Sequence, residues 1–357
     1  MNTVGVGIVG CGFVGRGAHV PAFGSIEGAQ LVAVADADAK RLGKVQKKYP
    51  LKTAYQDYAE LVKDPDIQAV VVSLPTPLHA KASMAAIAAG KHVLCEMPLA
   101  ANLEEADQLI EAAQKAGVIL MPSLNFRFTP NYVKAKAMIE QGVVGKPACA
   151  IYREFISAKD LADQWPPSSW MWKLQESGGP LYTLCVWSID LLRWLFQTDI
   201  TEVHSAVKYS PLSQFGGTLG YDASATVRLA NGMVGSLQYS GNVTRSSSTS
   251  RLEVVGDSNT LIDATWNDTL TVFGDEPAKS EWKVGEPGAR MWGHYQMDEY
   301  FVRCIQQGQA PSITPQDGRR AMEIGLQIVQ AANQGAAGAR FMNVGQAVPA
   351  DHARGGT

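Results

Sequence analysis

Three glycines at the end of a short apolar run have the types and spacing needed to bind a phosphate. The run Val4–Val9 leads into Gly10-x-Gly12-x-x-Gly15, and a helix-like segment begins at Arg16. Gly10 permits a sharp turn, and Gly12 lets the backbone approach a pyrophosphate with no side chain in the way. Gly15 lets the following helix pack closely on the strand, and the N-terminus of that helix presents N–H donors to phosphate oxygens. The pattern predicts a dinucleotide site.

Asp36 supplies the acidic residue that a dinucleotide site requires. It ends a second apolar run, Leu31–Ala35, about twenty residues beyond the last glycine, where a carboxylate can accept hydrogen bonds from the ribose hydroxyls. The same carboxylate would repel a 2′-phosphate, so we expect NAD as the cofactor. Lys40 and Arg41 could pair with such a phosphate, and NADP therefore stays possible.

The elements that must hold these residues alternate between strands and helices over residues 4–122. This alternation predicts a parallel, doubly wound sheet of the Rossmann type in a domain spanning residues 1–122. A Pro-rich turn, Leu74–His79, and a second turn, Glu96–Pro98, each follow an apolar strand. We expect both turns at the carboxyl ends of the strands, where such sheets bind ligands.

The pattern changes after Pro122. Strand-like runs near 201–210, 221–229, 233–240, 251–255 and 260–273 have no long helices between them, and Asn231-Gly232 predicts a hairpin. An α/β domain over residues 123–344 with an open, mainly antiparallel sheet is therefore expected, with helices near 181–195, 294–307 and 315–334. The segment from Ala158 to Gly179 is interpreted as irregular, and residues 345–357 as a flexible tail. One face of the open sheet needs a cover, which predicts a homodimer or homotetramer.

The amino-acid composition argues against several kinds of partner. The 357 residues are 46% hydrophobic and carry a net charge of -3, which argues against nucleic acid or an anionic membrane as a partner. Five scattered cysteines and six dispersed histidines show no metal-ligand spacing, so no metal is expected. The chain starts directly with a strand and shows no secretory signal, and we expect a cytoplasmic protein that binds a small molecule.

Taken together, these motifs resemble the glucose–fructose oxidoreductase / inositol dehydrogenase / MocA (Gfo/Idh/MocA) family over nearly the whole chain. The resemblance is carried by the glycine pattern, Asp36 and several further stretches: Pro75-Thr-Pro-Leu-His79, Ala88-Ala-Gly-Lys-His-Val-Leu-Cys-Glu96-x-Pro98, Arg127-Phe-Thr-Pro130, Trp172-Lys173, Gly178-Gly179, Trp187-x-x-Asp190 and Gly318-Arg-Arg-Ala-Met-Glu323.

The resemblance implies hydride transfer between NAD(P) and a hydroxyl or carbonyl carbon of a sugar, a cyclitol or a related molecule. It also implies which residues line the cofactor site: Gly10, Gly12, Phe13, Val14, Gly15, Asp36, Arg41, Leu74, Pro75, Thr76, His79, Glu96, Met97 and Asn125.

The chain departs from the family where the family moves a proton. The family's Lys, Asp and His fall on Met97, Thr183 and Trp187, which we call the relay positions. None of these three can carry a proton at neutral pH. Tyr182 is the remaining acid/base candidate if Lys173 or Arg127 lowers its pKa, and Thr183 could hold a water.

Five residues are predicted to line the substrate pocket: Met97, Arg127, Trp172, Lys173 and Trp187. The aromatic members could cover a flat substrate, or they could instead fill the core between two domains. Arg127 and Lys173 could hold an anionic group, or they could be solvated at the surface.

Two hypotheses follow, and a third possibility, redox-neutral chemistry such as elimination or epimerisation with a tightly held cofactor, is singled out by no residue. The first is an NAD(P)-dependent oxidoreductase acting on a sugar-like or modified-sugar hydroxyl, for which Tyr182→Phe abolishes turnover while cofactor binding persists. The second is a catalytically silent protein that binds NAD(P) or a metabolite as a sensor, because the family's proton relay is missing while the glycine pattern is intact.

Overall fold

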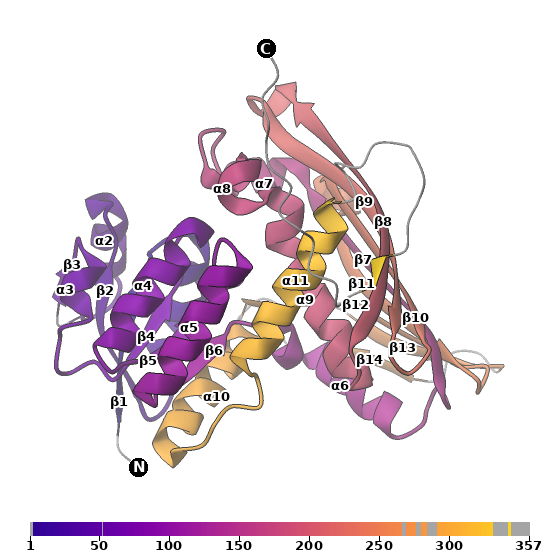
Figure 1. The fold of residues 1–357 in the computed structure, drawn as a ribbon, viewed down its shortest axis with the longest axis horizontal. Coiled ribbons are helices and arrows are strands. Elements are labelled where there is room, and N and C mark those ends of the chain that lie inside the picture. The colour runs from indigo at the N-terminus through magenta and orange to yellow at the C-terminus, as the bar shows by residue number, and fades with distance from the viewer. Residues whose placement is uncertain are drawn as a thin grey trace.

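The computed structural model describes residues 3–51, 53–265, 269–275, 280–283, 291–330 and 342–343. These residues form two sheets that lie side by side, each carrying helices, with one C-terminal helix, α11 (Pro315–Gln330), between them (Figure 1). The predicted tail at 345–357 lies outside the described residues. Within the described part of the chain, no helix combines the length and apolarity needed to cross a lipid bilayer.

The first sheet is parallel throughout, with strand order β3-β2-β1-β4-β5-β6. Every residue of β1 and β4 is buried, as expected for central strands covered on both faces. The order reverses between β1 and β4, so their carboxyl ends form the crevice in which doubly wound sheets bind ligands. The strands are β1 (Val4–Val9), β2 (Ala29–Ala35), β3 (Thr53–Tyr55), β4 (Ala69–Val72), β5 (His92–Cys95) and β6 (Leu120–Pro122).

Helices connect these strands, and the first of them is irregular. The chain leaves the glycine turn through a π-helical turn, η1 (Gly15–His19), before α1 (Val20–Phe23). Three further helices are α2 (Ala39–Gln46), α3 (Tyr58–Leu61) and α5 (Leu103–Ala116). Helix α4 (Thr76–Ala88) begins earlier than expected, because Pro77 fits its first turn. The predicted turn at Leu74–His79 is therefore mostly helix.

The second sheet is mainly antiparallel, with order β14-β13-β12-β11-β7-β10-β9-β8-β15 and one parallel pair, β7 with β10. The predicted hairpin joins β9 to β10, with Gly232 at a φ of 89°. The strands are β7 (Pro147–Ser157), β8 (Ile200–Leu212), β9 (Thr218–Leu229), β10 (Val234–Val243), β11 (Thr249–Gly256), β12 (Leu261–Thr265), β13 (Thr269–Phe273), β14 (Ser280–Lys283) and β15 (Met342–Asn343).

Helices cover one face of this sheet. Helix α9 (Gly179–Phe196) lies on it, and α11 (Pro315–Gln330) packs against both α9 and α5, joining the two halves of the molecule (Figure 1). Helix α6 (Pro130–Glu140) follows the 3-10 turn η2 (Asn125–Phe128). Helix α10 (His294–Gln307) matches its predicted range and packs against α1 and η1.

The sequence suggested that the segment between β7 and α9 is irregular. The structure shows instead that it contains short helices. It contains α7 (Ala158–Gln164), the 3-10 turn η3 (Trp170–Trp172) and α8 (Leu174–Ser177). Ser157 and Ser169 accept backbone N–H hydrogen bonds at the starts of α7 and η3. The fold class predicted from the sequence is confirmed: a Rossmann sheet followed by an α/β part with an open, mainly antiparallel sheet.

Candidate active site

The glycine turn has the geometry of a dinucleotide loop. Gly10 has a φ of 101°, and a Cβ there would collide with the carbonyl of Ser73. A Cβ at Gly15 would collide with the carbonyl of Gly10. A Cβ at Gly12, by contrast, would meet no atom within 4 Å. Two of the glycines are therefore required by the fold, whereas Gly12 opens space that the protein itself does not fill.

Asp36 lies beside this loop with its carboxylate held in place. It accepts hydrogen bonds from the backbone N–H groups of Cys11 (2.8 Å) and Asp38 (2.9 Å), and it is 8% exposed. Arg41 lies 3.7 Å from it on the solvent side. Phe13 is exposed on the same loop and pairs with the ring of Trp292 at 6.1 Å between centroids.

The second half of the predicted cofactor site comes from the turns after β4, β5 and β6. Pro75 caps α4, and the buried Oγ1 of Thr76 has no hydrogen-bond partner in the described part of the chain. Asn125 donates from Nδ2 to the carbonyl of Trp292 (2.8 Å), while its buried Oδ1 also lacks a partner there. Buried polar atoms of this kind require a partner, and a bound dinucleotide would supply one. These residues and the open space at Gly12 fit NAD.

His79 holds the two turns together. Its Nδ1 lies 2.7 Å from the carbonyl of Pro98, and its Nε2 lies 2.6 Å from the carbonyl of Leu74. Burial lowers the pKa of the imidazole, although both carbonyls oppose that shift. Its contacts position the cofactor turns.

None of the three relay positions carries a group that titrates near neutral pH, and the structure fixes each of them by other contacts. Met97 is buried, and Thr183 donates its hydroxyl to the carbonyl of Gly179 (3.0 Å). Trp187 donates from Nε1 to the carbonyl of Ser123 (2.8 Å), just after β6. This hydrogen bond fastens α9 to the carboxyl edge of the Rossmann sheet.

The structure separates the two predicted pocket cations. Arg127 is 9% exposed at its side chain and makes two hydrogen bonds to Asp190, of 2.7 and 2.6 Å. Lys173 is 51% exposed and pairs with Glu176 at the surface. Trp172 is half-buried and donates from Nε1 to the carbonyls of Trp165 and Pro166.

Tyr182 lies in the core of the second half of the molecule. Its side chain is 0% exposed, and its hydroxyl has no hydrogen-bond partner within the described ranges. Burial raises the pKa of its hydroxyl well above the usual range, with a smaller contribution from Cys185. The expectation that Lys173 or Arg127 lowers this pKa is wrong, because both cations pair elsewhere.

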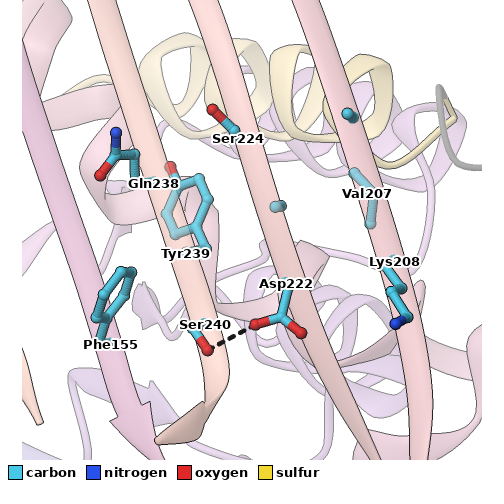
Figure 2. Close-up of a pocket in the computed structure, with 10 residues that line it drawn as sticks. Phe155, Val207, Lys208, Asp222, Ser224, Gln238, Tyr239 and Ser240 are labelled. Atoms are coloured by element: carbon cyan, nitrogen blue, oxygen red, sulfur yellow. Dashed lines mark hydrogen bonds between the residues drawn. The ribbon is translucent and has the colours of Figure 1, made fainter. Parts of the chain in front are cut away.

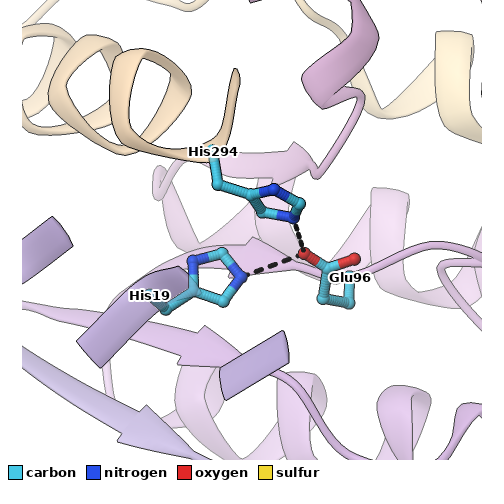
Figure 3. A group of neighbouring side chains, drawn as sticks. All are labelled: His19, Glu96 and His294. Carbon is cyan, nitrogen blue, oxygen red and sulfur yellow. Dashed lines mark hydrogen bonds and ion pairs between the residues drawn. The ribbon is translucent and has the colours of Figure 1, made fainter. Parts of the chain in front are cut away.

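A buried cluster that the sequence did not reveal includes His19, in the turn that follows the dinucleotide loop, together with Glu96 and His294 (Figure 3). His19 places Nε2 2.9 Å from Oε1 of Glu96 and Nδ1 2.9 Å from Oδ2 of Asp298. His294 lies 3.3 Å from the same Oε1, and Ser123 donates to it at 2.6 Å. We call His19, Glu96, His294 and Asp298 the junction cluster, because it joins η1, the end of β5 and α10.

Electrostatics explain how the junction cluster is stable in the core. Burial favours a neutral His19, but Asp298 and Glu96 outweigh it and raise its pKa to about 10. Burial likewise opposes charge on Glu96, yet His19 and His294 hold its pKa below the usual range. Because His19, Glu96 and His294 offer ligand atoms within 4.8 Å of one another, these three could also hold a metal ion. Hydrogen bonds already account for their positions.

Comparison with known proteins agrees with this geometry. Residues 4–124 match the model of the oxidoreductase family with an NAD-binding Rossmann fold, and residues 132–262 match the GFO/IDH/MocA C-terminal domain. The chain is 30% identical over 327 residues to inositol 2-dehydrogenase of Acidothermus cellulolyticus, covering 90% of each chain. It is 28% identical over 331 residues to myo-inositol 2-dehydrogenase of Thermotoga maritima, covering 90% of this chain and 93% of that one.

A solved structure shows the same fold. Levoglucosan dehydrogenase, in complex with NADH and levoglucosan, superposes with a TM-score of 0.83 at 24% identity, covering 97% of this chain and 100% of that one. The dinucleotide loop, the Rossmann topology and these matches lead to one conclusion: the chain belongs to the Gfo/Idh/MocA family of NAD-dependent oxidoreductases.

Proposed function

We propose that this protein is a dehydrogenase of a cyclitol or another sugar-like polyol, exchanging a hydride between NAD and one ring hydroxyl carbon. The observation that carries the proposal is the hydrogen bond from Trp187 to the carbonyl of Ser123. It places α9, which carries two of the relay positions, at the edge of the sheet where the cofactor turns end. Relatives named for inositol and levoglucosan support a ring polyol as substrate.

The residues of the chain have separable roles in this reaction. The dinucleotide loop and Asp36 bind the cofactor, and Leu74–His79 and Glu96–Pro98 position its nicotinamide end. NAD supplies the hydride acceptor and donor. Met97 and Trp187 give the pocket an apolar wall, which favours a ring with one less polar face. Tyr182 and Thr183 contribute hydrogen bonds to the substrate.

The test is oxidation of a defined panel in the presence of NAD⁺. Myo-inositol, scyllo-inositol and levoglucosan are the expected substrates, sorbitol is the open-chain control, and reduced-nicotinamide absorbance is the readout. Repeating the panel with NADP⁺ tests the cofactor preference predicted from Asp36. Tight NADH binding with no turnover of any ring polyol or of the corresponding ketones would contradict the proposal and favour a binding protein.

We further propose that the outer face of the second sheet binds a second copy of this chain. Figure 2 shows part of this face, where Phe155, Asp222 and Lys208 border a hollow of about 600 Å³. Elsewhere on it, Val234 and Val255 pair with Cys149 from its two sides and are 39% and 37% exposed. Adjacent exposed apolar side chains of this kind are typical of an interface.

A further inference from the structure

Glu154 is a buried carboxyl on the face of the second sheet that α9 covers. In the sheet it lies between Tyr239 of β10 and Ser250 of β11. The hydroxyl of Tyr152, two residues earlier on β7, donates to Oε2 of Glu154 at 2.9 Å. Ser250 lies 2.6 Å from that same hydroxyl. Glu154 is 7% exposed, and no cation pairs with it among the described residues.

Three tyrosine hydroxyls on the same side of the sheet are buried without a hydrogen-bond partner in the described ranges: Tyr182 of α9, Tyr209 of β8 and Tyr221 of β9. The ring of Tyr221 lies over Gly241, where an added Cβ would stand 2.5 Å from it. The hydroxyl of Tyr209 would stand 3.9 Å from a Cβ on Gly179, at the start of α9. Leaving a buried hydroxyl unpaired costs about 1–3 kcal/mol, so each of the three has an unmet hydrogen bond that a ligand hydroxyl could complete.

Aromatic contacts connect Glu154 with the relay positions. The ring of Phe126 lies 6.5 Å from that of Tyr152, which bonds Glu154, and 6.4 Å from that of Trp187. Trp187 is in turn fastened to Ser123 at the carboxyl edge of β6. Tyr152, Phe126 and Trp187 therefore form a continuous series of contacts from Glu154 to the turn after β6.

We propose that Glu154 is the catalytic residue that takes the hydroxyl proton of the substrate, in place of the family's missing Lys, Asp and His. The hydroxyls of Tyr182, Tyr209 and Tyr221 bind neighbouring hydroxyls of the same polyol ring. This inference rests on the proposed dehydrogenase function, and it adds the group that the reaction otherwise lacks.

The step balances in atoms and charge. Glu154, as a carboxylate, accepts the proton from the substrate O–H while the carbon–oxygen double bond forms. The hydride leaving the same carbon reduces NAD⁺, so the alcohol loses two electrons and the cofactor gains them. Glu154 then releases its proton to solvent, and the reverse reaction uses the neutral carboxyl as the acid.

The environment of Glu154 suits this task. Burial raises its pKa to about 7, with the hydrogen bond from Tyr152 opposing the shift. A base with a pKa near the working pH is the most effective proton acceptor. The titratable groups that face it are all normally neutral, namely Tyr132 of α6, Cys185 of α9, Tyr152 of β7, Tyr221 of β9 and Tyr239 of β10.

The experiment compares wild type with Glu154→Gln, using Glu253→Gln as a matched control. Glu253 lies on the neighbouring strand β11, where it pairs with Arg251 at 3.2 Å. In Glu154→Gln we expect kcat for the ring polyol to fall about 100-fold or more, while the Kd of NADH stays within about threefold. The acidic limb of the wild-type kcat/KM profile, near pH 7, should disappear from the residual activity of Glu154→Gln. Glu253→Gln should match wild type in kcat, in the Kd of NADH and in the pH profile of kcat/KM.

Two measurements do not depend on turnover. In difference infrared spectra of the NADH-loaded protein, the carboxyl band of Glu154 should titrate near pH 7, and myo-inositol should shift that titration. Glu154→Gln should also raise Tm at pH 8 more than at pH 5, because the buried carboxylate is unfavourable only when ionised.

A variant that retains more than a fifth of wild-type kcat, or a carboxyl band that no panel polyol shifts, would overturn the role of Glu154. A wild type that turns over nothing, but whose Glu154 band responds to a polyol, would overturn the dehydrogenase function and leave Glu154 in the ligand site.

Discussion

The imidazole of His19 lies 2.9 Å from the carboxylate of Glu96, although 77 residues separate them. His19 ends the turn that follows the dinucleotide loop, and Glu96 begins the turn predicted to hold the nicotinamide end of the cofactor. The pair therefore connects the two halves of the predicted cofactor site. Asp298 holds the other nitrogen of the same ring and extends the connection to α10.

The stability of this connection should depend on pH. A histidine whose pKa rises on folding, here from 6.5 to about 10, stabilises the fold fully below pH 6.5. That stabilisation is lost as pH rises through 10. We expect His19→Gln to lower the free energy of unfolding by about 3 kcal/mol at pH 6, because two buried carboxylates lose their charged partner. The difference from wild type should shrink steadily towards pH 10 in urea titrations.

His204→Gln, on the second sheet, controls for the loss of a histidine outside the junction cluster. A deficit for His19→Gln that stays constant from pH 6 to pH 10 would show that a neutral imidazole provides the stabilisation.

Gly12 and Gly15 should respond in opposite ways to the same substitution. Gly12→Ala places a methyl group where no protein atom lies within 4 Å, so Tm should change by no more than about 1 °C. The same methyl group obstructs a pyrophosphate, and the Kd of NADH should rise at least about tenfold. Gly15→Ala collides with the carbonyl of Gly10 and should lower Tm. Calorimetry and NADH fluorescence titration check both variants. Unaltered NADH binding by Gly12→Ala would contradict the predicted role of the loop.

Arg127 and Lys173 were both predicted to line the substrate pocket, yet their loss should change the stability of the fold by different amounts. Arg127→Met leaves Asp190, which is 1% exposed, without its two-pronged partner and should cost about 3–5 kcal/mol. Lys173→Met removes one exposed pair with Glu176 and should cost no more than about 0.5 kcal/mol. Urea denaturation measures both. If both variants lost the same free energy of unfolding, the difference in burial between the two ion pairs would not determine their contribution to stability.

Local patterns in the sequence were sufficient to predict most of the fold. The glycine spacing, Asp36 and the uniformly apolar strands define the Rossmann sheet, because each signal depends on residues close together in the chain. The start of α4 was missed because prolines at 75 and 77 suggest a turn, although Pro75 also fits the N-cap of a helix and Pro77 its first turn. The short helices between β7 and α9 were missed because they contain few turns and little periodicity.

The candidate site was less accessible from the sequence, because tertiary contacts decide it. The partners of His19 lie 77 and 279 residues away, and no local spacing signals them. Arg127 was assigned to the pocket, and only its distance from Asp190 reveals a different partner. Glu154 lies on a strand of alternating pattern, where one carboxylate facing inward cannot be distinguished from one facing solvent until the register is known.

The outer face of the second sheet should hold two copies of the chain together. Val255→Asp places a charge on its exposed apolar part, and it should shift the protein to a lower oligomeric state in light scattering coupled to size-exclusion chromatography. Val133→Asp, which changes a 45% exposed side chain on helix α6 instead of the sheet face, serves as a control and should leave the mass unchanged. A wild type that elutes as a monomer at high concentration would contradict the predicted dimer or tetramer.

Tyr182→Phe should separate binding from stability. The hydroxyl is buried and has no partner among the described residues, so removing it should leave the free energy of unfolding unchanged or raise it by up to about 1 kcal/mol. If the hydroxyl binds the substrate, the affinity of the NADH-loaded protein for myo-inositol should fall about five- to tenfold, as measured by calorimetry. Tyr152→Phe is the contrasting variant, because that hydroxyl bonds both Glu154 and Ser250 and its loss should cost about 1–3 kcal/mol. A Tyr182→Phe protein that is clearly less stable, with unchanged polyol affinity, would give its hydroxyl a structural role and remove it from the substrate site.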